Sequence, residues 1–133
     1  MQESAERCTS VRDPDSKGTI LIAEDGAAIR RFVTGVLEEQ GYSVLAASDG
    51  AEALGLAESY AGDIHVLLTD FDMPRLNGAE LTEAMRRLFP SVGVIVMSGD
   101  LKRETSVHIS GVSFLGKPFA ASALLEKVRA VLG

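Results

Sequence analysis

Short apolar runs alternate with amphipathic stretches along most of this chain. Runs of four to six hydrophobic residues bounded by Gly, Asp or Asn are typical of strands that are buried on both faces of a parallel sheet. Apolar residues spaced three or four positions apart are typical of the helices that cover such a sheet. The runs predict five strands, at residues 19–23, 42–47, 66–70, 93–97 and 112–115.

A helical pattern follows each run. The first predicted helix lies before Gly41 and has an apolar face of Ile29, Phe32, Val33, Val36 and Leu37. Further helices are predicted at residues 51–60, 79–89, 101–110 and 120–132, and the apolar face of the one at 79–89 consists of Leu81, Ala84, Met85 and Leu88. Five strand–helix alternations with short connections predict an α/β fold, a doubly wound five-stranded parallel sheet with helices on both faces.

The domain organisation follows from the same pattern. Residues 1–18 are polar, mixed in charge and without periodicity, which predicts a flexible tail or the remnant of a linker. Residues 19–133 form one predicted domain, since their composition does not change and no internal repeat is present. The formal net charge is −6, from 13 basic and 19 acidic residues, which argues against nucleic acid as a direct partner.

No targeting or membrane segment is expected. The first residues are acidic and lack the apolar stretch of a signal peptide, and the longest apolar runs, such as 93–97, are too short to span a bilayer. Cys8 is the single cysteine and has no partner for an intrachain disulfide, which fits a reducing compartment. We therefore expect a cytoplasmic protein that does not contact the membrane.

Charged and polar residues follow the ends of four of the five predicted strands. Glu24 and Asp25 come after the first, Asp70 ends the third, Ser98 follows the fourth and Lys117 comes after the fifth. Because the carboxyl ends of parallel strands meet at one edge of the sheet, these groups are expected to converge. Taken alone, Asp70 fits a turn-capping aspartate equally well.

Three converging carboxylates need a positive counterpart. A pair of like charges 4 Å apart repels by about 4 kcal/mol at an effective dielectric constant near 20. Mg²⁺ prefers hard oxygen ligands and commonly takes one or two carboxylates together with phosphate oxygens. A lysine and a hydroxyl beside such an ion suit the remaining oxygens of a phosphoryl group. The constellation indicates Mg²⁺-assisted phosphoryl transfer.

Six short motifs carry a resemblance to a known family. They lie at residues 20–25 (ILIAED), 41–44 (GYSV), 49–54 (DGAEAL), 67–78, 96–99 (VMSG) and 116–119 (GKPF). In this order and spacing, over about residues 18–133, the sequence resembles the receiver domains of two-component response regulators. The resemblance implies a flavodoxin-like (βα)5 fold with strand order 2-1-3-4-5.

The resemblance also implies roles for the residues at the strand ends. Asp70 is then the phosphorylated residue, which accepts its phosphoryl group from a phosphohistidine on a histidine kinase or a histidine phosphotransfer protein. Asp25, with Glu24 assisting, Asp70 and the backbone carbonyl of Asp72 would bind Mg²⁺. Lys117 would pair with phosphoryl oxygens and form a cis peptide bond with the following proline.

Ser98 and Phe114 fall on the switch positions of the family. The Ser98 hydroxyl would hydrogen-bond to the phosphoryl group, and Phe114 would be the aromatic switch residue. Simpler interpretations stay open: Phe114 as core, Ser98 as a turn hydroxyl, Lys117 as a surface lysine. Glu24 and Asp25 also fit a helix amino terminus, where acids complement the dipole.

No output domain is expected after the last predicted helix, so the signal is expected to leave through a surface. In the family this surface corresponds here to residues 101–132, which would contact a downstream protein. The chain is accordingly expected to be a signalling receiver rather than an enzyme, with phosphotransfer to its own aspartate and slow autodephosphorylation. It fits a stand-alone regulator or the receiver of a hybrid histidine kinase in a phosphorelay.

Three positions depart from the commonest family pattern. Glu24 is one methylene longer than the usual aspartate, so its contact with the metal is either direct or through water. Asp72 adds a further acid beside the site, and replacing it with alanine is expected to change the dephosphorylation rate. Phe114 lacks the hydroxyl of the tyrosine often found there.

An alternative from another class is a phosphatase of the haloacid dehalogenase type, with Asp70 as nucleophile and Asp72 as general acid and base. In that family the Asp-x-Asp motif ends the first core strand, whereas Asp70 ends the third predicted strand. Glu24 and Asp25 would have no role, and the acidic motif expected after the lysine is missing. A receiver fold that acts by binding alone is disfavoured, since the full set of phosphorylation residues is present.

Overall fold

The computed structural model describes residues 16–71, 73, 76–99 and 111–133. The predicted helix at 101–110, most of the predicted tail and the whole of Asp72, including the carbonyl expected to bind Mg²⁺, lie outside the described residues. Within them, the strands are β1 (Thr19–Ala23), β2 (Ser43–Ala47), β3 (Val66–Asp70), β4 (Gly93–Ser98) and β5 (Val112–Gly116). The helices are α1 (Ala27–Glu39), α2 (Gly50–Ser59), α3 (Gly78–Leu88) and α5 (Ala121–Leu132).

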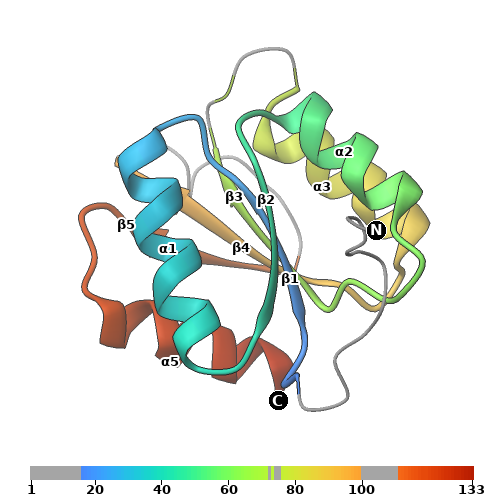
Figure 1. The fold of residues 1–133 in the computed structure, drawn as a ribbon. Helices are drawn as coiled ribbons and strands as arrows, with labels where there is room; N and C mark the ends of the chain where they lie inside the picture. Colours follow the sequence, from blue (N-terminus) through green and yellow to red (C-terminus); the bar gives the residue numbers. More distant parts are fainter. Residues whose placement is uncertain (1–15, 72, 74–75, 100–110) are drawn as a thin grey trace, which may run out of the picture.

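All strand pairs are parallel, and the sheet order is β2-β1-β3-β4-β5. This confirms the predicted doubly wound, flavodoxin-like fold. Figure 1 shows the sheet between two helical layers, with α1 and α5 on one face and α2 and α3 on the other. The chain order reverses between β1 and β3, the position at which such sheets open toward ligands.

Two hydrophobic clusters lie on opposite faces of the sheet. In the α1/α5 cluster the helices contribute Val33, Leu37, Leu124 and Val128. In the α2/α3 cluster they contribute Ala53, Ala57, Leu81 and Met85. Successive β1 residues alternate between the two clusters, because side chains of a strand point to opposite faces. Burial on both faces explains why the strands appear in the sequence as unbroken apolar runs.

Two large hydrophobic residues expected on buried helix faces are partly exposed. Phe32 is 45% exposed and Leu88 is 42% exposed. In α1, Val33 and Leu37 point to the sheet, so Phe32 lies at the margin of the helix face and packs beside the ring of Phe119. Leu88 is the last residue of α3, where the helix leaves the sheet.

The strand boundaries differ from the expectation by one residue at several ends. Tyr42 precedes β2 instead of opening it, yet its side chain is buried in the α1/α5 cluster. The fourth and fifth strands each continue one residue further, to Ser98 and Gly116. Among the described residues, no helix combines the length and the apolar character needed to cross a bilayer.

Candidate functional site

The register of the sheet brings the predicted site residues to one edge. Asp70 lies opposite Met97 across the β3–β4 pair, and Ser98 lies opposite Gly116 across the β4–β5 pair. On the other side of β3, the last paired residue of β1 is Ala23, directly before Glu24. The carboxyl ends of β1, β3, β4 and β5 therefore meet where parallel α/β sheets bind ligands.

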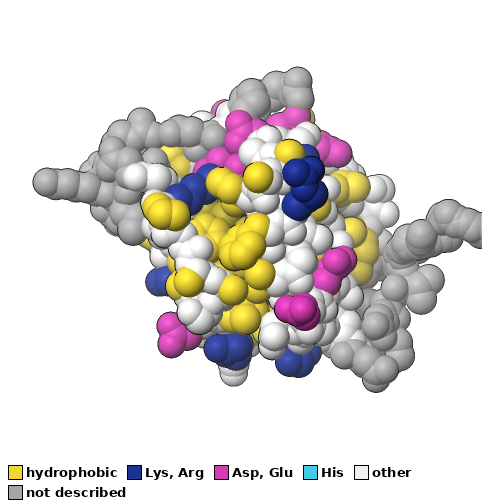
Figure 2. Space-filling model, turned by 60° about the vertical axis from the view of Figure 1, so that its left-hand side comes forward, with side chains coloured by type: hydrophobic (Ala, Val, Ile, Leu, Met, Phe, Trp, Pro, Cys, Tyr) yellow, Lys and Arg dark blue, Asp and Glu magenta, His cyan; other side chains and the backbone are white. Residues whose placement is uncertain are grey.

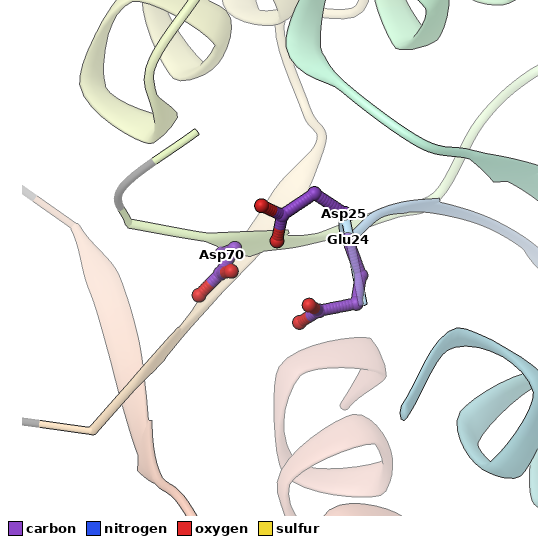
Figure 3. A group of neighbouring side chains, drawn as sticks. All are labelled: Glu24, Asp25 and Asp70. Carbon is purple, nitrogen blue, oxygen red and sulfur yellow. The ribbon is translucent and has the colours of Figure 1, made fainter. Parts of the chain in front are cut away.

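Three carboxylates converge at this edge. Glu24, Asp25 and Asp70 each offer an oxygen within 4.8 Å of the others. Figure 3 shows the three side chains directed toward one region beyond the ends of β1 and β3. Their environments differ, since Glu24 is buried, Asp25 is exposed and the Asp70 side chain is 13% exposed. Asp25 thus has open access to solvent, whereas Asp70 is largely covered by the protein.

Lys117 connects two of the three acids. Its Nζ donates to Glu24 Oε1 at 2.8 Å and to Asp70 Oδ1 at 3.0 Å. The other carboxylate oxygen of Glu24, Oε2, accepts the backbone N–H of Gly26 at 2.8 Å. Both Glu24 oxygens are therefore engaged by protein donors, whereas Asp25 has the most open access to solvent of the three acids. A buried glutamate held in this way is a counterion that fixes the position of Lys117.

Protonation of the site reflects its burial and its charges. The pKa of Asp70 is raised to about 6: burial is the main cause, the charges of Glu24 and Asp25 add to the rise, and the hydrogen bond and charge of Lys117 oppose it. Burial alone would lower the pKa of Lys117, but its hydrogen bonds to Glu24 and Asp70 raise it overall. Lys117 therefore stays protonated, and Asp70 titrates close to neutral pH when no cation adds to the site.

Ser98 and Phe114, the predicted switch residues, lie on neighbouring strands. Ser98 is 2% exposed, and its carbonyl accepts the backbone N–H of Lys117 at 2.7 Å, so the end of β4 positions the lysine. Phe114 lies opposite Val96 and packs, half-buried, against the α2/α3 cluster. The Lys117–Pro118 peptide bond is cis, as the resemblance implied.

Two contacts of Glu24 were not foreseen from the sequence. One is the ion pair with Lys117, and the other is the hydrogen bond that Arg30 Nη1 donates to the Glu24 carbonyl at 2.8 Å. The extra methylene of glutamate was the available signal, because it lets the carboxylate reach across to β5. Arg30 carried no signal, since its partner is a backbone atom.

The residues present fit a hard divalent cation. Among the residues that the structure describes, Glu24, Asp25 and Asp70 are the group of three acids spaced to share an ion. One lysine ammonium faces three carboxylates and pairs with two of them, so the site keeps an excess of negative charge that a cation would neutralise. Carboxylate oxygens of this kind match Mg²⁺ rather than a soft metal.

Comparison with known proteins adds the family context. A family model described as response regulator receiver domain matches residues 20–129. The chain is 37% identical over 117 residues to the CAI-1 autoinducer sensor kinase/phosphatase CqsS of Vibrio cholerae, which covers 84% of this chain and 17% of that protein. It is 31% identical over 120 residues to the chemotaxis protein CheY1 of Helicobacter pylori, which covers 86% of this chain and 96% of that protein.

Solved structures give the same picture. The receiver domain of the hybrid histidine kinase CckA is 37% identical, with a TM-score of 0.77 over 87% of this chain and all of that one. A CheY-like receiver domain protein from Methanospirillum hungatei is 32% identical, with a TM-score of 0.79 over 88% of this chain and 94% of that one. The chain spans 13% of the sensor kinase CckA of Brucella abortus and 49% of the probable transcriptional regulator ycf27 of Guillardia theta.

Proposed function

The chain belongs to the response regulator receiver domains of two-component signalling, and from this premise we propose that Asp70 accepts a phosphoryl group from a phosphohistidine. The observation that carries the proposal is the shared ion pair of Lys117 with Glu24 and Asp70, with Asp25 alongside. This arrangement brings a nucleophile, a cation for phosphoryl oxygens and two further acids together at one edge of the sheet.

The proposed reaction is a displacement at phosphorus. An ionised Asp70 oxygen attacks the phosphorus, an O–P bond forms, and the P–N bond breaks with its electron pair returning to the imidazole nitrogen. Positioning and electrostatic stabilisation supply most of the catalysis in reactions of this type. The Asp70 carboxylate must be deprotonated, and a pKa of about 6 leaves most of it ionised at neutral pH.

The surrounding residues have distinct proposed tasks. Bound Mg²⁺ would be held by Asp25 and Asp70, with Glu24 near it and the backbone carbonyl of Asp72 as a further ligand, and would neutralise negative charge on the phosphoryl group. Lys117 exchanges its bond with Asp70 for one with a phosphoryl oxygen while keeping its bond with Glu24. The Ser98 hydroxyl donates to another phosphoryl oxygen. The acyl phosphate is then lost slowly to water.

The proposed output is a change of surface. Phosphorylation adds about two negative charges to an edge that is already acidic, which shifts a conformational equilibrium. Ser98 and Phe114 are the proposed switch residues, and the surface formed by residues 101–132 is proposed to bind a downstream protein. Within that range, 101–110 lies outside the described residues, whereas β5 and α5 are in place beside the site.

The phosphohistidine partner needs a surface next to Lys117. An apolar groove, the Lys117 groove, has a volume of about 270 Å³ and is lined by Ile29, Phe32, Lys117, Pro118 and Phe119. Figure 2 shows a band of hydrophobic side chains on this side of the molecule, with charged side chains around it. Lys117 belongs to both the groove and the site. We therefore place the kinase or phosphotransfer helix that carries the histidine on this groove.

The central test is phosphorylation without a kinase. The protein is incubated with a small phosphodonor and Mg²⁺, and the mass of the intact chain is measured before and after hydroxylamine treatment. We expect one phosphoryl group, labile to hydroxylamine and missing from Asp70→Asn. No label on the wild type, or undiminished label on Asp70→Asn, would contradict the proposal.

The phosphatase of the haloacid dehalogenase type is not supported. Asp70 ends the third strand of a sheet ordered 2-1-3-4-5, and Lys117 pairs with both Asp70 and Glu24. The proteins and structures reported above are kinases, regulators and receiver domains. Sustained turnover of a phosphate ester would be the result that revives the phosphatase.

A further inference from the structure

The start of α2 lies against the segment that leads from β3 to α3. A Cβ atom built on Gly50, the first residue of α2, would lie 2.8 Å from Leu76 Cβ and 2.9 Å from the Leu76 carbonyl carbon, and nearer still to the carbonyl oxygen. Apart from its own residue, its chain neighbours and the nearby backbone of its helix, a real Cβ atom essentially never has a heavy atom within 3.0 Å. Only glycine therefore permits this backbone approach.

A second glycine allows a close backbone contact at the other end of the same segment. A Cβ on Gly78, the first residue of α3, would lie 2.7 Å from the Asp70 carbonyl oxygen and 3.2 Å from Phe71 Cα. The Gly78 N–H donates to the Phe71 carbonyl at 3.0 Å. At Gly78 the backbone thus comes back into contact with Asp70 and Phe71, and Leu76 lies two residues before this contact.

Both helix starts are fixed by their own caps. Asp49 caps α2 by accepting the N–H of Glu52 at 2.8 Å, and Glu52 in turn accepts the N–H and the hydroxyl of Ser48. Asn77 and Glu80 form a reciprocal capping box at the start of α3. Displacing either helix start costs free energy, because it breaks the capping hydrogen bonds.

We propose that Gly50 is a positioning residue for the Asp70 site. The three atoms nearest to a Cβ at this position all belong to Leu76, so Gly50 acts through Leu76, against which α2 packs. A side chain at position 50 forces the Leu76 backbone outward, and the displacement is carried to Phe71 and to the Asp70 carboxylate. This inference rests on the proposed function for the identity of the cation.

The test measures Mg²⁺ binding to the unphosphorylated protein by titration calorimetry with magnesium chloride. The matched control is Gly55→Ala in the same helix, because Gly55 is exposed and a Cβ there has no neighbour within 4 Å. We expect Gly50→Ala to bind Mg²⁺ about tenfold more weakly, the usual scale for residues that orient metal ligands. Gly55→Ala is expected to keep the wild-type affinity. Unchanged affinity in a folded Gly50→Ala protein overturns the inference.

A measurement on the wild type covers the case in which Gly50→Ala does not fold. The amide signals of Gly50 and Gly55 are followed by NMR during the same Mg²⁺ titration. We expect the Gly50 signal to shift with the binding curve and the Gly55 signal to stay in place. A Gly50 signal that does not respond overturns the inference alone, whereas a wild type that binds no Mg²⁺ overturns the proposed function with it.

Discussion

The two edges of this sheet differ in the chemistry of the side chains that they bring together. At the carboxyl ends of the strands, three acids lie within 4.8 Å of one another beside Lys117. At the amino ends, a basal cavity of about 350 Å³ is lined by Asp63, Ile64, His65, Leu88, Phe89, Pro90, Ser91, Val92, Val131 and Leu132. This cavity exceeds the Lys117 groove in volume, yet the group of three acids found among the described residues lies at the other edge.

The polar groups of the two edges are engaged differently. At the basal cavity, His65 joins the strand starts: its Nδ1 accepts the Thr19 N–H at 3.0 Å, its N–H donates to the Thr19 carbonyl, and its carbonyl accepts the Gly93 N–H. At the other edge, one ammonium faces two carboxylates and a third acid lies open to solvent. Unbalanced negative charge distinguishes the edge at which we propose phosphorylation from the basal edge.

Of the changes considered, removing Lys117 should have the largest effect, and it should act on the rate of phosphorylation. In Lys117→Met, Glu24 and Asp70 lose their shared cation, and no ammonium meets the transferred phosphoryl group. We expect phosphorylation by a small phosphodonor to slow about a hundredfold or more, the scale seen when one electrostatic donor is removed from an active site. Lys17→Met, at the amino-terminal edge, is the control and should label at the wild-type rate, as measured by intact mass over time. Equal rates for the two variants would contradict the role of Lys117.

Removing His65 should disturb stability and leave the chemistry intact. In His65→Ala the buried N–H of Thr19 loses its acceptor, so we expect a loss of about 2 kcal/mol in the free energy of unfolding. His65→Asn keeps a side-chain acceptor and should recover part of that loss in urea unfolding. Both variants should take up the phosphoryl label at the wild-type rate once folded. A slow rate in folded His65→Asn would show that the two edges are coupled.

The pH dependence of stability should isolate Asp70. Its pKa of about 6 in the folded protein lies above the ordinary value of 3.8, so the folded state binds the proton more tightly than the unfolded chain. This contribution is complete below about pH 3.8 and is lost as the pH rises through 6. Without Mg²⁺, wild-type stability relative to Asp70→Asn should fall by about 2 kcal/mol between pH 4 and pH 7. A constant difference across that range would contradict the raised pKa.

Phe32 and Leu88, which are large, hydrophobic and exposed, offer the mildest comparison, with one at each edge. Phe32 lines the Lys117 groove and Leu88 lines the basal cavity, at 45% and 42% exposure. We expect Phe32→Ala to slow transfer from a phosphorylated histidine phosphotransfer domain about fivefold, because it removes an aromatic contact of the partner. Transfer from a small phosphodonor should be unchanged, and Leu88→Ala should alter neither rate. An equal loss with both phosphodonors would place Phe32 in the chemistry instead of in docking.

The sheet and the reactive edge could be predicted because their signals are local. A strand buried on both faces must be apolar throughout, so the run before Asp70 identifies both the strand and its last residue. Once five such strands alternate with helices, a parallel sheet brings Glu24, Asp70 and Lys117 to one edge. The convergence of these acids already indicated Mg²⁺, whereas the individual ligand roles and the switch positions came from the family resemblance.

The parts that were missed depend on contacts between distant segments. Phe32 and Leu88 match the helical period, but their exposure depends on where each helix crosses the margin of the sheet. The pairing of Glu24 with Lys117 joins residues 93 positions apart. The approach of Gly50 to Leu76 depends on how α2 packs beside α3, and a glycine at the start of a helix carries no sign of its neighbour.

The sheet divides the hydrophobic core into two clusters, and this division affects how the sequence of such a domain can change during evolution. The α1/α5 cluster underlies the Lys117 groove, whereas the α2/α3 cluster lies across the sheet from it. Substitutions in clusters that share no contacts tend to have additive effects on stability. Substitutions that reshape the proposed docking groove can therefore accumulate independently of changes on the opposite face. The same partition makes the two faces independent targets for engineering specificity and thermal tolerance.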